Sequence, residues 1–216
     1  MNAALGLRVH SGWTALVAMC VDAGEPEVLL RERVELVKTF SYKFRQPYHT
    51  AEKLPIARGR EFISRVNAEA RQLSYRAMRA AQAELTKREY RLAACGMLLA
   101  SGRPLPRLEN ILASHALIHT ADGELFRGAL AHASARCGLP VLRVRDRELL
   151  RDAAQTLGIQ EATLLKRITE LGKPLGSPWS QDEKYAALVA WLALLNGKAS
   201  ADTRARRDAK NTDQAI

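Results

Sequence analysis

The stretch that most constrains this chain is an apolar run near its start, broken by one tight turn. Residues 5–10 form a short β-compatible segment, and residues 13–21 are almost entirely apolar. Between them lie Ser11 and Gly12, and glycine adopts the positive φ values that tight hairpin turns require. We therefore predict two antiparallel strands here. A hairpin at the start of an α/β chain is typical of the centre of the sheet.

The order of the later elements follows from apolar periodicity and from glycine and proline positions. After the hairpin we predict a third strand over 28–37, an irregular segment over 39–55, a long helix over 56–90 and a buried strand over 92–100. A helix over 106–137, bent near 120–123, then precedes a strand over 139–144 and helices over 147–157, 161–171 and 180–195. Ser180 and Glu183 form a Ser-x-x-Glu capping box for the last helix. The predicted fold class is α/β, with three antiparallel strands and then two parallel ones in a five-stranded mixed sheet flanked by helices.

Composition sets the domain organisation and the compartment. With 47% apolar residues in 216, the chain can form one core, which we assign to residues 1–197. Residues 198–216 are polar and charged, and we expect a disordered tail. No apolar run reaches the roughly 18 residues of a membrane span, and no signal peptide is evident. Cys20, Cys95 and Cys137 are widely spaced, as expected of reduced thiols in a cytoplasmic protein without a membrane partner.

The net charge of +10 favours a polyanionic partner. Nucleic acid is the expected partner, with DNA and RNA both open, and a homodimer is one option for the oligomeric state. Four basic residues of the long helix fall within one narrow stripe at 100° per residue: Arg58, Arg65, Arg76 and Lys87. Such a stripe is either a face that follows nucleic-acid phosphates or an ordinary solvated helix face.

Three segments carry a resemblance to a known family. Residues 6–13 read Gly-Leu-Arg-Val-His-Ser-Gly-Trp, residues 137–141 read Cys-Gly-Leu-Pro-Val, and residues 182–190 place two acidic residues before an alanine-rich apolar face. Together with the element order, they resemble the first strand, the entry to the fifth strand and the last helix of the ribonuclease H-like superfamily. The similarity is to its branch of RuvC-type Holliday-junction resolvases, and it covers about residues 4–195.

The resemblance implies two divalent cations held by carboxylates from the first strand, the end of the fourth strand and the last helix. Such metals activate a water and stabilise the leaving oxygen. Here the first-strand position is Arg8, the fourth strand ends in Ala100 and Ser101, and only Asp182 and Glu183 match an acidic position. One acidic pair cannot hold two metals. We therefore predict a nucleic-acid-binding protein without a standard two-metal nuclease centre, and a divalent metal cofactor is not favoured.

Arg8 and His10 alternate onto one face of the first strand. A charged arginine inside a central strand costs free energy unless it is paired, so Asp182 or Glu183 is its expected partner. The pair could be a purely structural replacement for the metal centre. Alternatively, an anion-binding groove could be lined by Arg8, His10, Ser101 and His49.

A second candidate site starts from His115 and His119, which a continuous helix would place on one face. Glu124 follows, and two histidines with a carboxylate are a ligand set for transition metals. The favoured alternative is that these histidines pack in the core or contact a partner. They define a competing hypothesis, a hydrolase whose relocated catalytic site is formed by His115, His119, Glu124 and Asp182. A third hypothesis is a protein-interaction or regulatory domain that keeps the fold only as a scaffold.

Overall fold

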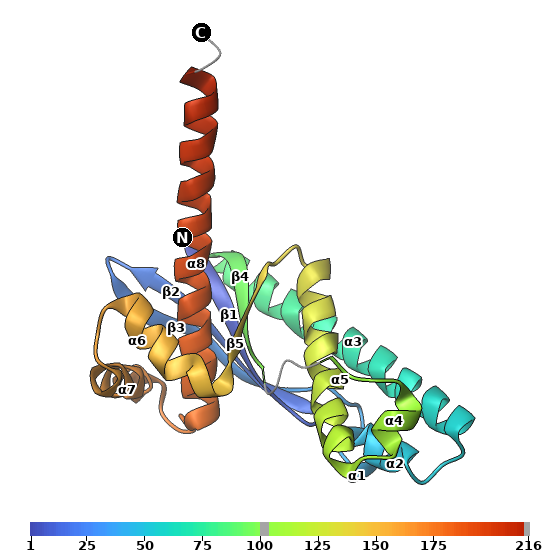
Figure 1. Cartoon of the computed structure of the whole chain (residues 1–216). Helices are drawn as coiled ribbons and strands as arrows, with labels where there is room; N and C mark the ends of the chain where they lie inside the picture. Colours follow the sequence, from blue (N-terminus) through green and yellow to red (C-terminus); the bar gives the residue numbers. More distant parts are fainter. Residues whose placement is uncertain (100–103, 214–216) are drawn as a thin grey trace.

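The computed structural model describes residues 1–99 and 104–213, with side chains described for residues 1–99 and 104–197. Its strands form one five-stranded mixed sheet in the order β3-β2-β1-β4-β5 (Figure 1). The strands are β1 (Asn2–His10), β2 (Trp13–Asp22), β3 (Glu25–Glu35), β4 (Arg91–Leu99) and β5 (Val141–Arg145). The first three pair antiparallel, β4 pairs parallel with β1, and β5 pairs parallel with β4. The predicted mixed sheet is confirmed.

The hairpin of β1 and β2 lies inside the sheet, as predicted. Its turn has Gly12 at a φ of +83°, in the left-handed region that favours glycine. Side chains of β1 alternate between two cores: Leu5 and Leu7 belong to one, and Ala4 belongs to the other. Because the alternation has a period of two, Gly6, Arg8 and His10 share the face of Ala4.

Helices cover both faces of the sheet (Figure 1). On one face lie α3 (Ile56–Lys87) and α5 (His115–Arg136), which bury Phe62, Met78, Phe126 and Leu130 against the β1 side chains. On the other face lie α8 (Gln181–Asp213), α6 (Leu149–Leu157) and α7 (Glu161–Glu170). Residues 186–194 of α8 are all nearly or fully buried, so this helix is the centre of the second core.

Helix α8 lies directly on the backbone of β1 and β4. A Cβ atom added to Gly6 would come within 1.8 Å of the Ala186 carbonyl oxygen, and one added to Gly96 within 2.2 Å of the Val189 carbonyl oxygen. Only glycine permits such an approach between a strand and a helix. The contact fixes the position of α8 along the two central strands.

Two short helices occupy the segment that we expected to be irregular, α1 (Tyr42–Arg45) and α2 (Pro47–Ala51). The predicted bend near 120–123 is wrong, because α5 is continuous through these residues. The interruption comes earlier, at 113–114, between α4 (Leu108–Leu112) and α5. Glycine and threonine weaken a helix by less than about 1 kcal/mol each, and the packing of α5 outweighs that cost.

The predicted end of the last helix at Leu195 is also wrong. Helix α8 continues through Asn196 and Gly197 to Asp213. The Asn196 side chain donates a hydrogen bond to the Leu192 carbonyl one turn earlier, within the helix, instead of ending it. Side chains of residues 198–216 lie outside the described residues, so the division into a domain and a tail stays a prediction.

No helix in the described part of the chain is long and apolar enough to cross a membrane. Among the described residues, Cys20, Cys95 and Cys137 are all unpaired. Burial raises the pKa of the Cys95 thiol to about 12, so this thiol stays protonated and unreactive in the folded protein.

The contact of α8 with the sheet yields a first prediction. Gly6→Ala and Gly96→Ala should each lower the free energy of unfolding by about 3 kcal/mol, the upper end for an overpacked core, because helix backbone must move. Gly128→Ala is the matched control, since a Cβ at this exposed position of α5 meets nothing within 4 Å. Gly128→Ala should raise the free energy of unfolding by up to about 1 kcal/mol through helix propensity. Urea denaturation measures all three, and a Gly6→Ala variant of wild-type stability would contradict the packing described.

Candidate functional site

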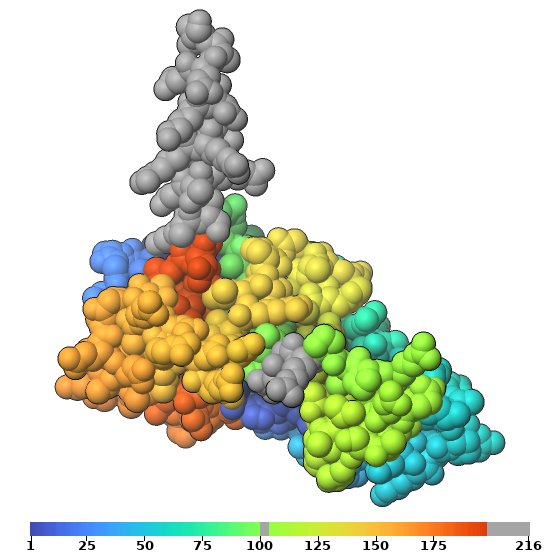
Figure 2. Space-filling model, viewed as in Figure 1, coloured from blue at the N-terminus to red at the C-terminus, as the bar shows by residue number. Residues whose placement is uncertain are grey.

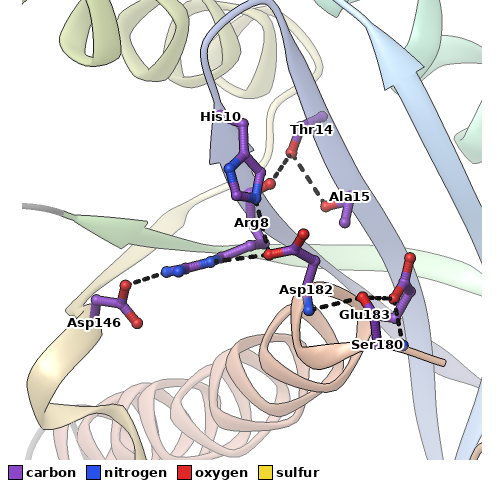
Figure 3. Close-up of polar contacts among 8 residues, drawn as sticks. All are labelled: Arg8, His10, Thr14, Ala15, Asp146, Ser180, Asp182 and Glu183. Atoms are coloured by element: carbon purple, nitrogen blue, oxygen red, sulfur yellow. Dashed lines mark hydrogen bonds and ion pairs between the residues drawn. The ribbon is translucent and has the colours of Figure 1, made fainter. Parts of the chain in front are cut away.

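An ion-pair network lies where the end of β1 meets the start of α8 (Figure 3). The Arg8 guanidinium pairs through Nη1 with Asp146, and its Nε donates to Oδ1 of Asp182 at 3.4 Å. Nε2 of His10 lies 2.8 Å from the same Asp182 oxygen. The Arg8 side chain is only 22% exposed. One strand thus supplies two basic groups, and two later segments supply the carboxylates.

Chain direction explains why these residues meet. Because β1, β4 and β5 run parallel, their carboxyl ends share one edge of the sheet, and Asp146 directly follows β5 there. The α8 contact brings in the other carboxylate. Asp182 precedes Ala186, which lies on Gly6, by about one helical turn, and Arg8 follows Gly6 by two strand residues.

The capping box decides which acidic residue of α8 pairs with Arg8. The Ser180 N–H donates to the Glu183 carboxylate at 2.8 Å, and the Asp182 N–H donates to Ser180 Oγ at 3.2 Å. Glu183 is therefore held at the helix start, and Asp182 is the residue that faces Arg8 and His10 (Figure 3). The predicted pairing of Arg8 with an acidic residue of the last helix is confirmed for Asp182.

Asp146 is a site residue that the sequence analysis missed. The only available signal was its place, directly after the predicted fifth strand and therefore at the same sheet edge as the end of β1. Its carboxylate changes the charge of the network, because two carboxylates now face one guanidinium. Such a surrounding stabilises a cation and does not attract a phosphate.

A cluster of three histidines joins α2 to α5. His49 is buried, whereas His115 and His119 are exposed, and one ring nitrogen of each lies within 4.8 Å of the others. Nε2 of His115 and Nε2 of His119 are 3.0 Å apart. The two residues share one face of α5, as their spacing predicts. His49, which we considered for a groove with Arg8, belongs to this cluster.

Asp122 orients the buried histidine. Its Oδ2 lies 2.5 Å from Nδ1 of His49, and its Oδ1 accepts the Tyr48 N–H at 2.7 Å. Burial raises the pKa of the Asp122 carboxyl above its ordinary value, and the hydrogen bonds from Tyr48 and His49 oppose that shift. With Nδ1 engaged, Nε2 is the remaining nitrogen of His49. The sequence analysis missed Asp122, although it lies one turn beyond His119.

The four residues predicted for a relocated catalytic site are not brought together. His115 and His119 are in the histidine cluster, Glu124 accepts a hydrogen bond from Arg127 at 3.0 Å, and Asp182 is in the Arg8 network. His10 and His119 nevertheless line one small hollow of about 270 Å³. Ala100 and Ser101, which were considered at the end of the fourth strand, lie outside the described residues.

A basic cleft of about 600 Å³ lies at the start of α3, beside α1 and α2. The cleft is lined by four cationic side chains, those of Lys43, Lys53, Arg58 and Arg65. Among the described lining residues, Glu61 supplies the single carboxylate. Tyr42 also lines the cleft and is 57% exposed. In Figure 2 this part of the molecule is the cyan region next to the green surface that includes α5. Two members of the predicted basic stripe thus contribute to the cleft.

The other two members of the stripe lie farther along α3. Arg76 is exposed, and Lys87 is exposed with its Nζ 3.7 Å from the Glu84 carboxylate. All four stripe residues are therefore accessible on one helix, and Arg58 and Arg65 share the basic cleft with two lysines.

Comparison with known proteins bears on the fold. The sequence matches no protein-family model and no curated protein. Among solved structures, Thermus thermophilus RuvC is similar with a TM-score of 0.50 at 13% identity, covering 92% of this chain and 96% of RuvC. The chain has a ribonuclease H-like fold. The same values hold for T. thermophilus RuvC in complex with Holliday junction substrate. The yeast mitochondrial Holliday junction resolvase Ydc2 is similar with a TM-score of 0.48 at 10% identity, covering 94% of this chain and 85% of Ydc2.

In this ribonuclease H-like fold, the Arg8 network lies at the carboxyl edge of the parallel strands. The geometry of the network yields a second prediction. Arg8→Gln should lower the free energy of unfolding by about 1–3 kcal/mol, because two partly buried carboxylates then lose their counter-charge. The measurement is chemical denaturation at neutral pH.

Arg151→Gln is the matched control. Its guanidinium pairs with Asp152 at 2.9 Å, but the arginine side chain is 66% exposed. An exposed pair contributes less than about 1 kcal/mol. Equal losses in the two variants would show that the Arg8 network is no more than a surface ion pair.

Proposed function

We propose that this protein binds nucleic acid through its basic cleft and does not carry a standard two-metal nuclease centre. The single observation that carries the second part is the Arg8 guanidinium held between Asp146 and Asp182. The network lies on β1 and α8, two of the elements from which the resemblance draws metal-binding carboxylates. A guanidinium takes the role that a divalent cation would have beside these carboxylates.

Electrostatics supports this reading of the network. A divalent cation about 4 Å from a guanidinium would be repelled by about 8 kcal/mol at an effective dielectric constant of 20, since each unit charge contributes about 4 kcal/mol. Asp146 and Asp182 already satisfy the guanidinium, so they are poor ligands for a second cation. We therefore assign a structural role to Arg8 and His10, instead of the phosphate contacts considered from the sequence.

The basic cleft supports nucleic-acid binding. Lys43, Lys53, Arg58 and Arg65 offer positive charge around one concave surface, and Tyr42 offers an exposed aromatic ring there. Proteins that bind single strands combine a cationic groove with aromatic rings on which bases stack. We propose that the cleft takes an unpaired stretch of nucleic acid. A solved structure of RuvC in complex with Holliday junction substrate supports the coarser part of this proposal, that the partner is a nucleic acid. The unpaired cysteines are consistent with a reducing, cytoplasmic location.

A binding experiment tests the proposal. Fluorescence anisotropy with labelled single-stranded DNA, RNA, duplex DNA and a four-way junction should show binding at low salt. With four phosphate contacts, affinity for a single strand should fall about 50-fold between about 50 and 200 mM salt. The Arg58→Ala/Arg65→Ala double variant should remove about half of the salt dependence and weaken binding. The matched control, Arg151→Ala/Lys166→Ala, removes two charges from α6 and α7 and should bind as wild type.

Three other outcomes separate the competing hypotheses. No measurable binding at low salt would overturn the nucleic-acid proposal. Metal-dependent cleavage of duplex or branched substrates that is lost in His119→Ala would instead favour a hydrolase with a relocated site. If neither binding nor cleavage is found, an interaction or regulatory domain on a ribonuclease H-like scaffold is the remaining account.

A further inference from the structure

We infer that His49, His115 and His119 form a binding site for one divalent transition metal, with Zn²⁺ as the best fit. These three residues are the only group in the described part of the chain whose histidine, cysteine or carboxylate atoms converge closely enough to share a metal ion. Imidazole nitrogens suit Zn²⁺, Co²⁺, Ni²⁺ and Cu²⁺, whereas Mg²⁺ and Ca²⁺ prefer oxygen ligands.

The distances fit tetrahedral coordination after a small closure. Zn–N bonds of about 2.0–2.1 Å place neighbouring ligand nitrogens about 3.3 Å apart. The nitrogens of His115 and His119 are 3.0 Å apart, and all three ligand atoms lie within 4.8 Å of one another. His115 and His119 are exposed and can rotate toward a metal. His49 is buried and supplies a fixed point for the site.

Asp122 adds the second element of a metal site. A histidine that binds zinc usually donates its other ring N–H to a carboxylate, which fixes the ring and increases its basicity. The Asp122 carboxylate holds Nδ1 of His49 at 2.5 Å and is itself held by the Tyr48 N–H. This arrangement leaves Nε2 of His49 available, and it places a buried carboxyl group behind the cluster.

The fourth coordination position is open. Two of the three histidines are exposed, and His119 also lines the hollow that it shares with His10, Ser11 and Arg127. Three protein ligands with one open position are the arrangement of zinc sites that exchange a water or a ligand, whereas structural sites have four protein ligands. Because His49 lines the basic cleft as well, the open position is near the surface that we propose for nucleic acid. Metal binding itself does not depend on that proposal.

The test is a zinc titration of the whole 216-residue chain after treatment with a chelator, without nucleic acid. Competition with a chromogenic chelator should give one Zn²⁺ per chain. Co²⁺ should give the visible absorption of a four-coordinate complex, and added Zn²⁺ should raise the melting temperature, because the metal joins α2 to α5. His115→Ala should weaken Zn²⁺ binding by at least about 100-fold. Asp122→Asn keeps an acceptor for the Tyr48 N–H and should weaken Zn²⁺ binding about 10- to 100-fold.

His132→Ala is the matched control, since His132 is an exposed histidine on the same helix and outside the cluster. It should bind Zn²⁺ as wild type does. The test uses the exposed His115 and His119 because substituting the buried His49 risks unfolding. Less than one Zn²⁺ per chain, or equal affinity in His115→Ala, His119→Ala and His132→Ala, would overturn the inference. Failure of nucleic-acid binding would leave this titration unaffected, so the two proposals fail separately.

Discussion

The backbone contact of α8 with Gly6 and Gly96 is the constraint on which the rest of the site depends. It brings a helix onto two central strands without any intervening side chain, and it fixes how far along β1 the helix begins. Asp182 therefore faces Arg8 and His10, one turn before the contact at Gly6. A side chain at either glycine would push α8 outward and separate the acidic residue from its basic partners.

The charged side chains at the sheet edge and those at the basic cleft differ in how far they are paired. At the carboxyl edge of the sheet, positive and negative groups satisfy one another, so Arg8 is not available to a polyanion. An excess of positive charge gathers instead at the basic cleft, where four cationic side chains face the single carboxylate of Glu61 among the described lining. The histidine cluster lies between these two regions, since His49 lines the cleft and His119 lines the hollow beside His10. A strongly basic sequence is thus compatible with two carboxylates that face Arg8 at the sheet edge.

Local pattern was sufficient for the sheet, the hairpin and the pairing of Arg8 with the last helix, because each depends on periodicity or on chain direction. The pattern did not predict that Asp146 belongs to the site. It also did not predict the contact between His49 and Asp122, two residues that are 73 positions apart in the chain. The His49–Asp122 contact arises from helix packing and leaves no mark in a short window of sequence, whereas Asp146 was recognisable only from its place directly after the predicted fifth strand. The bend predicted near Gly123 failed for the same reason, because tertiary packing outweighs a weak local preference.

The central claim is that the Arg8 guanidinium stands where a divalent cation would otherwise be held. The direct measurement is the melting temperature of wild type, Arg8→Asp and Arg8→Asn with and without millimolar Mg²⁺, an ion that the histidine cluster does not favour. Wild type should not respond, and Arg8→Asn, which leaves two carboxylates without a counter-charge, should be stabilised by Mg²⁺ less than Arg8→Asp. Arg8→Asp should be destabilised without Mg²⁺ and should recover when Mg²⁺ binds the three carboxylates. An Arg8→Asp variant indifferent to Mg²⁺, or a wild type stabilised by Mg²⁺ to the same extent, would contradict the account.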